Sequence, residues 1–205
     1  MTAARRGPDR LALFQRAMDR QGIFTLAEAL QSGYSQPLVQ HFVRSGRFER
    51  IGSGVYRIVE YPRGETDRLA EISAILGPDA VLSHESALAL YAVSDVAPSE
   101  YHFTLPRSRR YARPPADDVV IHTVSTPLDP SDIENRHGFK TTSLARSIVD
   151  SARTGTAPEQ IEAAITTGLS RGLLREADLE RELEHQPSRV RTLIVHATDR
   201  AIRSQ

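Results

Sequence analysis

The chain has 205 residues, of which 40 % are apolar, which is enough for more than one small hydrophobic core, so two domains are expected. Its 26 basic and 26 acidic residues cancel, yet the first 60 residues hold nine arginines against five acidic residues, a net charge of +4. The remainder therefore carries about −4. This asymmetry favours an anion-binding N-terminal part and a C-terminal part with another role. The alternative is a chance scatter of surface charge.

Composition also excludes several classes of protein. There is no cysteine, so disulfides and thiolate metal sites are excluded and a reducing, cytoplasmic setting is expected. No stretch approaches the roughly 18 apolar residues of a membrane span. Arginines interrupt the first 20 residues, so neither a membrane partner nor export is expected.

Three short helices are predicted before residue 46. The first covers residues 9–22. Thr25 and Glu28 have the spacing of a capping box that starts the second helix, and Gly33 can end it. Ser35 can cap the third helix. Because the second and third helices are separated by only a few residues, the pair has the spacing of a helix-turn-helix.

A hairpin is predicted directly after the third helix, with strands at 48–51 and 55–58 and a reversal at Gly52-Ser53-Gly54. A basic hairpin in this place is typical of a wing, whose arginines hold phosphates while the helix reads base edges. An ordinary hairpin that closes a small core is the alternative. Tyr56 is interpreted as core or wing packing, with base stacking as the alternative. The predicted DNA contacts are Ser35, Gln36, Gln40, His41 and Arg44 of the helix, and Arg47, Arg50, Ser53 and Arg57 of the hairpin.

The block from residue 23 to residue 58, which includes GYSQPLVQHFVRSGRFERIGSGVYRI, carries a family resemblance. Together with LSHESALALYAVSD at 82–95 and TTSLARSIVDSA at 141–152, it resembles the AbiEi-type antitoxins of bacterial type IV toxin–antitoxin systems. The resemblance implies an N-terminal winged helix that represses its operon. It also implies a C-terminal domain that counters a nucleotidyltransferase toxin encoded beside it. The first block is the more specific part of the resemblance.

A break at YPRGE, residues 61–65, predicts a linker between a winged helix-turn-helix domain at 1–60 and a second domain at 61–205. The second domain is expected to be mixed α/β with a helical C-terminal end, so the fold class is α+β. Its predicted strands are 101–105, 119–124 and 139–141, and its predicted helices are 69–76, 83–93, 143–152, 158–174, 176–185 and 188–205.

A second basic cluster, RSRRYAR at residues 107–113, lies between two predicted strands. It can contact DNA phosphates, an RNA or an acidic toxin surface. A solvated hairpin arm is the alternative reading. The residues of this second basic contact site are Arg107, Arg109, Arg110, Tyr111 and Arg113.

The sequence lacks the signatures of common enzymes. Lys140 is the single lysine, and its neighbours form neither a phosphate-binding loop nor the Glu-x-Lys pair of a restriction-type nuclease. No nucleophile elbow or zinc-protease motif occurs. His102, His122 and His137 are candidates to converge, but single histidines on strands are usually core or surface residues. His84 and Glu85 are interpreted as helix-start residues, so no enzyme, metal or cofactor is expected.

Two functions are consistent with these patterns. The first is a DNA-binding autorepressor and antitoxin that counters a nucleotidyltransferase toxin, with two copies bound to inverted repeats of its own promoter. The second is an antitoxin that binds its toxin directly and whose winged helix is a scaffold that does not read DNA. The polar face of the third helix favours the first function, because a purely structural helix gains nothing from Gln36, Gln40 and Arg44 together.

Overall fold

The structure is a computed structural model that describes residues 7–203. The first six residues, with the Arg5 and Arg6 counted in the basic balance, and the last two residues of the predicted C-terminal helix lie outside this range. The chain folds into two compact units. The N-terminal unit holds the described residues up to Pro78 together with Asn135–Phe139, and the C-terminal unit holds Asp79–Glu134 and the described residues from Lys140 onward.

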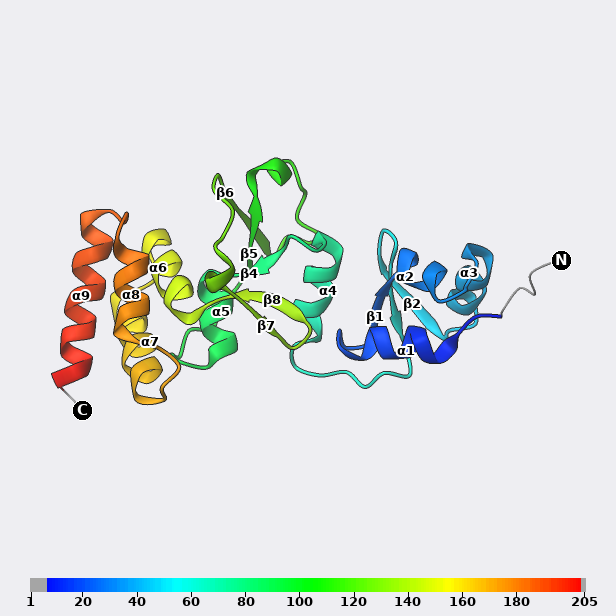
Figure 1. The fold of residues 1–205 in the computed structure, drawn as a ribbon, viewed down its shortest axis with the longest axis horizontal. Helices are drawn as coiled ribbons and strands as arrows, with labels where there is room; N and C mark the ends of the chain where they lie inside the picture. The colour runs from blue at the N-terminus through cyan, green and yellow to red at the C-terminus, as the bar shows by residue number, and fades with distance from the viewer. Residues whose placement is uncertain (1–6, 204–205) are drawn as a thin grey trace. The chain divides into compact units, whose positions relative to one another are not determined.

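Both units combine helices with a sheet, which confirms the mixed α+β composition of the chain (Figure 1). Between residues 7 and 203, no helix is both long and apolar enough to cross a membrane.

The N-terminal unit is built on a sheet of three strands in the order β1-β3-β2, as far as its described residues extend. Strand β3 is central and pairs antiparallel with both neighbours. The elements of this unit are α1 (Arg10–Met18), β1 (Ile23–Thr25), α2 (Leu26–Gln31), α3 (Gln36–Arg44), β2 (Phe48–Gly52), β3 (Val55–Ile58) and α4 (Asp67–Leu76).

The helix caps expected from the sequence are present. Thr25 and Glu28 form a reciprocal capping box at the start of α2. The Ser35 side chain accepts a hydrogen bond from the first turn of α3. Gly33 has φ +80°, a left-handed conformation that favours glycine, and it lies in the short turn between α2 and α3. The three predicted N-terminal helices are thus confirmed, although α1 ends at Met18 and the short strand β1 was not predicted.

An aromatic cluster forms the core of this unit. The ring of Phe24 lies 4.8 Å from that of Phe48 and 5.7 Å from that of Tyr56, measured between centroids. Tyr34 and Phe42 extend the cluster from the α2–α3 side. Tyr56 is 3 % exposed, which confirms its interpretation as a core residue. These rings join α3 to the sheet and so determine which face of α3 is left outside.

Arg57 was predicted to contact DNA, and this prediction is wrong. The side chain is 1 % exposed and forms ion pairs with Asp67 at 2.8 Å and with Glu71 at 3.7 Å, both on α4. Its Nη2 also donates to the carbonyl of Pro62 at 3.3 Å. A buried guanidinium is stable only when carboxylates and carbonyls replace its water, so Arg57 is committed to the interior of the unit.

Helix α4 lies beyond the predicted linker but belongs to the N-terminal unit. It packs closely on strand β2, where a Cβ at Gly52 would come within 2.7 Å of Ile75 Cγ1. Arg63 adds ion pairs to Glu49 and Glu71, at 2.8 and 3.1 Å. The segment 61–65 is therefore held within this unit, whose boundary lies at Pro78 rather than at residue 60.

The C-terminal unit contains strands of a five-stranded sheet, ordered β6-β5-β4-β8-β7 within the described chain. Strand β4 is antiparallel to β5 and parallel to β8, and β5 is parallel to β6. The tip between β7 and β8 is assigned to the N-terminal unit, where the carbonyl of His137 accepts a hydrogen bond from Gln21. The strands are β4 (Val81–Leu82), β5 (Tyr101–Pro106), β6 (Val119–Val124), β7 (Ile133–Arg136) and β8 (Phe139–Thr142).

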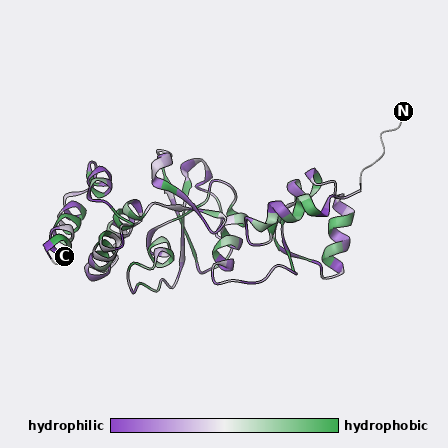
Figure 2. Ribbon diagram, turned by 60° about the horizontal axis from the view of Figure 1, so that its bottom comes forward, coloured by the Kyte–Doolittle hydropathy of each residue, from purple (hydrophilic) through white to green (hydrophobic). Residues whose placement is uncertain are grey.

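Helix α5 and a cluster of four further helices complete the C-terminal unit. Figure 1 shows α6 to α9 side by side, and Figure 2 shows apolar and polar residues on different sides of these helices. Their shared core includes Ile148, Ile161 and Ile194, each at most 1 % exposed. The bounds are α5 (His84–Tyr91), α6 (Leu144–Thr154), α7 (Pro158–Ser170), α8 (Glu176–Leu183) and α9 (Ser188–Arg203), with short 3₁₀ turns at Arg107–Arg109 and Pro130–Asp132.

A half-buried arginine joins two helices of the C-terminal unit. Arg146 of α6 forms ion pairs with Asp150 at 2.8 Å, Asp132 at 3.3 Å and Glu182 of α8 at 3.8 Å. Burial, followed by the hydrogen bond and negative charge of Asp132, raises the pKa of Glu182 to about 7. Because the pKa of Glu182 is raised, this carboxyl group keeps its proton to a higher pH than usual. The repulsion among the three carboxyl groups around the guanidinium is thereby reduced.

The stability of the N-terminal unit should depend on Arg57. Substituting Arg57→Ala leaves Asp67 and Glu71 without their buried cation, so we expect the free energy of unfolding to fall by about 3–5 kcal/mol. The control is Arg50→Ala, an exposed arginine on the adjacent strand, which should cost less than about 0.5 kcal/mol. Urea denaturation followed by tyrosine fluorescence measures both. Equal losses in the two variants would contradict a structural role for Arg57.

Candidate nucleic-acid interface

Helix α3 presents a polar face to solvent. Its Val39 is fully buried in the N-terminal core, whereas Gln36, His41 and Arg44 are exposed. Ser35, at the N-cap, is exposed as well. Because residues four apart lie on one side of a helix, Gln36 and Arg44 share the side that also holds position 40. One amphipathic helix therefore offers amide, imidazole and guanidinium groups to a partner.

Gln40 lies on this helix but is engaged inside the unit. It is half-buried, and its Nε2 donates a hydrogen bond to the hydroxyl of Tyr56 at 3.3 Å. Its amide is therefore partly used to fix α3 on strand β3. Among the residues predicted to read bases, Gln36 and Arg44 are more accessible than Gln40.

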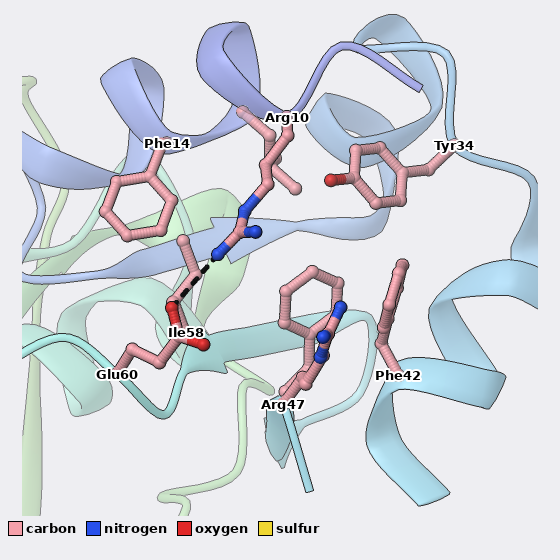
Figure 3. Close-up of a pocket in the computed structure, with 9 residues that line it drawn as sticks. Arg10, Phe14, Tyr34, Phe42, Arg47, Ile58 and Glu60 are labelled. Atoms are coloured by element: carbon pink, nitrogen blue, oxygen red, sulfur yellow. Dashed lines mark hydrogen bonds and ion pairs between the residues drawn. The ribbon is translucent and has the colours of Figure 1, made fainter. Parts of the chain in front are cut away.

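Arg47 follows α3 and stacks on an aromatic ring. Its guanidinium carbon lies 5.5 Å from the ring centroid of Phe42, and the side chain is exposed. Figure 3 shows Arg47 beside a small pocket across which Arg10 reaches Glu60 in an ion pair of 3.1 Å. The pocket has a volume of about 40 Å³, enough for water molecules but not for an organic ligand. Stacking orients the guanidinium of Arg47 while leaving its N–H groups available to an anion.

The β2–β3 hairpin carries two further exposed residues of the predicted interface, Arg50 and Ser53. The Nε of Arg50 donates to the carbonyl of Gly52 at 3.2 Å, which restrains the side chain along the hairpin. Arg57, on the second strand of the same hairpin, is buried and takes no part.

Some arginines of the first 60 residues are paired within the unit, and others are exposed to solvent. Arg10 is paired with Glu60, Arg20 with Glu28, and Arg57 with acids of α4. Arg16 donates a hydrogen bond to Gln31. Within the described part of this segment, three exposed arginines have no ion pair and no hydrogen bond to a side chain. They are Arg44, Arg47 and Arg50, which lie from the end of α3 into the hairpin.

The second predicted basic site lies in the C-terminal unit, in the connection between β5 and β6. All of its members are exposed, with Tyr111 at 81 %. They are Arg107, Arg109, Arg110, Tyr111 and Arg113.

A cluster of three histidines occupies the C-terminal unit. His102 of β5 and His122 of β6 share a hydrogen bond of 2.9 Å between Nδ1 and Nε2. The ring of His84 stacks on that of His122 with centroids 3.7 Å apart. Two of the three candidates named from sequence thus converge, but His137 belongs to the other unit and His84 takes the third place. The parallel register of β5 and β6 brings His102 and His122 together, and sequence patterns could not reveal it.

His84 has a second role, since it is the first residue of α5, with Glu85 in the first turn, as predicted. Its φ of +54° is rare for a residue with a side chain. A hydrogen-bond chain supports it, in which Thr104 donates to Ser83 at 2.8 Å and Ser83 contacts His84 Nδ1 at 2.9 Å. No group of three or more metal-ligating side chains suited to hold a metal ion occurs in the described part of the chain.

The histidine cluster is electrically neutral at neutral pH. Burial lowers the pKa of His84 to about 2 and that of His122 to about 4, and neighbouring positive charge adds to both effects. Burial also lowers the pKa of His102, against the opposing influence of Glu85 and Glu100. Neutral imidazoles can stack and share hydrogen bonds, whereas three imidazolium ions in this space would repel one another.

A helix pair with an exposed polar face, followed at once by a basic hairpin, is typical of regulators of transcription. Residues 12–59 match the family described as "Transcriptional regulator, AbiEi antitoxin". The resemblance predicted from sequence is thereby confirmed, and the match supports a role as antitoxin and regulator.

A comparison with solved structures covers nearly the whole chain. The chain is similar in structure to the RV2827C protein from Mycobacterium tuberculosis, with a TM-score of 0.61 and 15 % sequence identity over 97 % of this chain and 79 % of that one. At this identity the likeness concerns the fold alone. No curated protein gives a significant sequence match.

Acidification tests the neutral state of the histidine cluster. Unfolded histidines have a pKa near 6.5, so between about pH 6.5 and the folded value of about 4 for His122, the unfolded chain binds a proton that the folded chain does not. The free energy of unfolding should therefore fall as the pH is lowered through this window, and less so in His122→Gln. Urea denaturation at stepped pH measures the difference between the two proteins.

Two controls keep this test specific. Glu182, whose pKa is raised, changes stability in the opposite direction over this range, but its contribution is common to both proteins and cancels in the difference. His196→Gln, which replaces an exposed histidine of α9, is the matched control for the loss of one imidazole. A His122→Gln profile parallel to that of the parent protein would refute the neutral cluster.

Proposed function

We propose that the N-terminal unit is a winged helix-turn-helix that binds duplex DNA of the chain's own promoter. In this proposal α3 is the recognition helix and the β2–β3 hairpin is the wing. The observation that carries it is the exposure of Gln36 and Arg44 on α3 and of Arg47 and Arg50 directly after it, while the other face of α3 packs into the aromatic core. Guanidinium groups hold phosphates and read guanine, and the glutamine amide suits adenine.

The proposed role of each residue follows from its surroundings. Arg47 and Arg50 are restrained by Phe42 and by the hairpin carbonyl, so they suit phosphates at fixed positions. Gln36, His41 and Arg44 extend from α3 and suit base edges, while Ser35 and Ser53 suit phosphate oxygens. One module of this size reads only a few base pairs, so two copies on inverted repeats supply the specificity of an operator.

The antitoxin role is proposed for the C-terminal unit. The family match supports antitoxin activity for the chain, and the resemblance implies a nucleotidyltransferase toxin as the target. The chain acts by binding and not by catalysis in this proposal, in the cytoplasm where the promoter and the toxin are both present. An antitoxin that binds its toxin directly and does not read DNA is the competing function, and a mobility-shift assay on the upstream DNA separates the two.

Salt dependence tests the phosphate contacts. Each contact to duplex DNA adds about −0.9 to the slope of log affinity against log salt, so Arg47→Ala/Arg50→Ala should flatten the slope by roughly two. Fluorescence anisotropy with a promoter duplex at stepped salt concentrations measures it. Arg16→Ala, an exposed arginine on α1, is the matched control and should leave the slope intact. A slope unchanged in the double variant would exclude the hairpin as a wing.

Sequence discrimination tests the helix. Arg44→Ala should weaken binding to the chain's own promoter by about 1–3 kcal/mol and binding to a scrambled duplex by much less, because a bidentate contact distinguishes bases. Competition mobility shifts with both duplexes give the two values. Equal weakening on both DNAs would reassign Arg44 to a phosphate.

Antitoxin activity should survive the loss of DNA binding. The full-length Arg44→Ala/Arg47→Ala protein is expected to restore growth when it is co-expressed with the toxin encoded beside it, because its C-terminal unit is unaltered. The full chain is used because a cut at residue 60 would separate Arg57 from Asp67 and Glu71. Failure of a folded, abundant double variant to restore growth would show that the two activities are not separable.

A further inference from the structure

The connection between β5 and β6 forms a compact basic surface that the DNA interface does not use. Its residues 107–113 include four arginines and no acidic residue. It begins with the 3₁₀ turn Arg107–Arg109, and Figure 1 shows it in green, projecting beyond the strands. Since β5 and β6 are parallel, their carboxyl ends lie at one edge of the sheet, where the segment after β6 also begins.

Contacts within this surface orient its side chains. Arg107 Nη1 donates to Ser125 Oγ at 3.3 Å and so joins the two strand ends. The guanidinium of Arg110 lies 4.4 Å from the ring centroid of Tyr111. Arg109 forms an ion pair with Asp79 at 4.0 Å.

Tyr111 is the unusual member of the group. It is 81 % exposed, more than any other large apolar or aromatic side chain from residue 7 to residue 203. An aromatic ring generally buries its faces in a core, so an exposed ring with a guanidinium against it offers a planar platform to a ligand. The residues beside it are arginines, a serine and an alanine, which lack the contiguous apolar area of a protein interface core.

We propose that residues 107–113 bind single-stranded nucleic acid, with Tyr111 stacking on a base and the arginines holding the flanking phosphates. Stacking needs an exposed base face, which a duplex hides and a single strand presents. Guanidinium groups supply the electrostatic attraction and add cation–π contacts to the stack. This binding goes beyond the proposed promoter recognition and does not depend on it.

The test uses the full-length Arg47→Ala/Arg50→Ala protein, in which the proposed wing is weakened. Labelled 12-nucleotide oligouridylate, the equivalent oligothymidylate and a 12-base-pair duplex are titrated by fluorescence anisotropy. We expect one or both single strands to bind more tightly than the duplex, and preference between the two identifies RNA or DNA as the source. Adding Tyr111→Ala should weaken single-strand binding by about 5- to 140-fold, whereas Tyr111→Phe should retain it.

The arginines are tested in the same background. Adding Arg109→Ala/Arg110→Ala should flatten the salt dependence of single-strand binding by about 1.4, at about 0.7 per phosphate. Arg189→Ala removes an exposed arginine of α9 and should change nothing. The proposal is overturned if no single strand binds, if the duplex binds equally well, or if the loop variants match their parent. Loop variants that keep single-strand binding but fail to neutralise the toxin would assign the surface to a protein instead.

Discussion

The buried ion pairs of Arg57 with Asp67 and Glu71 hold the N-terminal unit together. Removing a guanidinium from water is costly, and the cost is offset only when carboxylates meet it at close range. Arg57 lies on the central strand of the sheet and its partners lie on α4, so the sheet and this helix must keep one relative position. The same strand carries Tyr56, which bonds Gln40 and stacks with Phe24. The position of α3 is thereby linked to the buried pair.

This constraint separates structural arginines from those available to a ligand. Arg10, Arg20 and Arg57 each face a carboxylate, so their charge is largely cancelled at a distance. Arg44, Arg47 and Arg50 are exposed along one stretch of the chain. A net charge of +4 in the first 60 residues therefore does not say which arginines are exposed and which are paired inside the unit.

In the C-terminal unit, buried ionisable groups are kept neutral rather than paired with an opposite charge alone. Its three histidines are kept neutral by burial, and Arg146 is surrounded by carboxyl groups of which Glu182 holds its proton to about pH 7. Both arrangements avoid uncompensated charge in the interior, and their effects on stability have opposite pH dependence. Its basic side chains at 107–113 are instead exposed, together with Tyr111, which is the arrangement from which single-strand binding is proposed.

The sequence by itself determined what depends on neighbours a few residues away. The capping box of Thr25 and Glu28, the Ser35 cap and the β2–β3 reversal were all predicted, because each is a contact within one turn of the chain. The family resemblance over residues 23–58 followed from the same local pattern, and residues 12–59 match that family.

Only the tertiary structure decided whether a side chain is buried or exposed when its partners are distant in sequence. Arg57 looked like Arg50 in the sequence, yet one lies under α4 and the other faces solvent. The three histidines come from segments up to 38 residues apart; the pairing of β5 with β6 brings His102 to His122, and the start of α5 adds His84. Strands β1, β4 and β7 are too short to show a periodic pattern, and they form because longer elements provide a partner edge. Burial and long-range pairing are properties of the folded chain, and local sequence does not contain them.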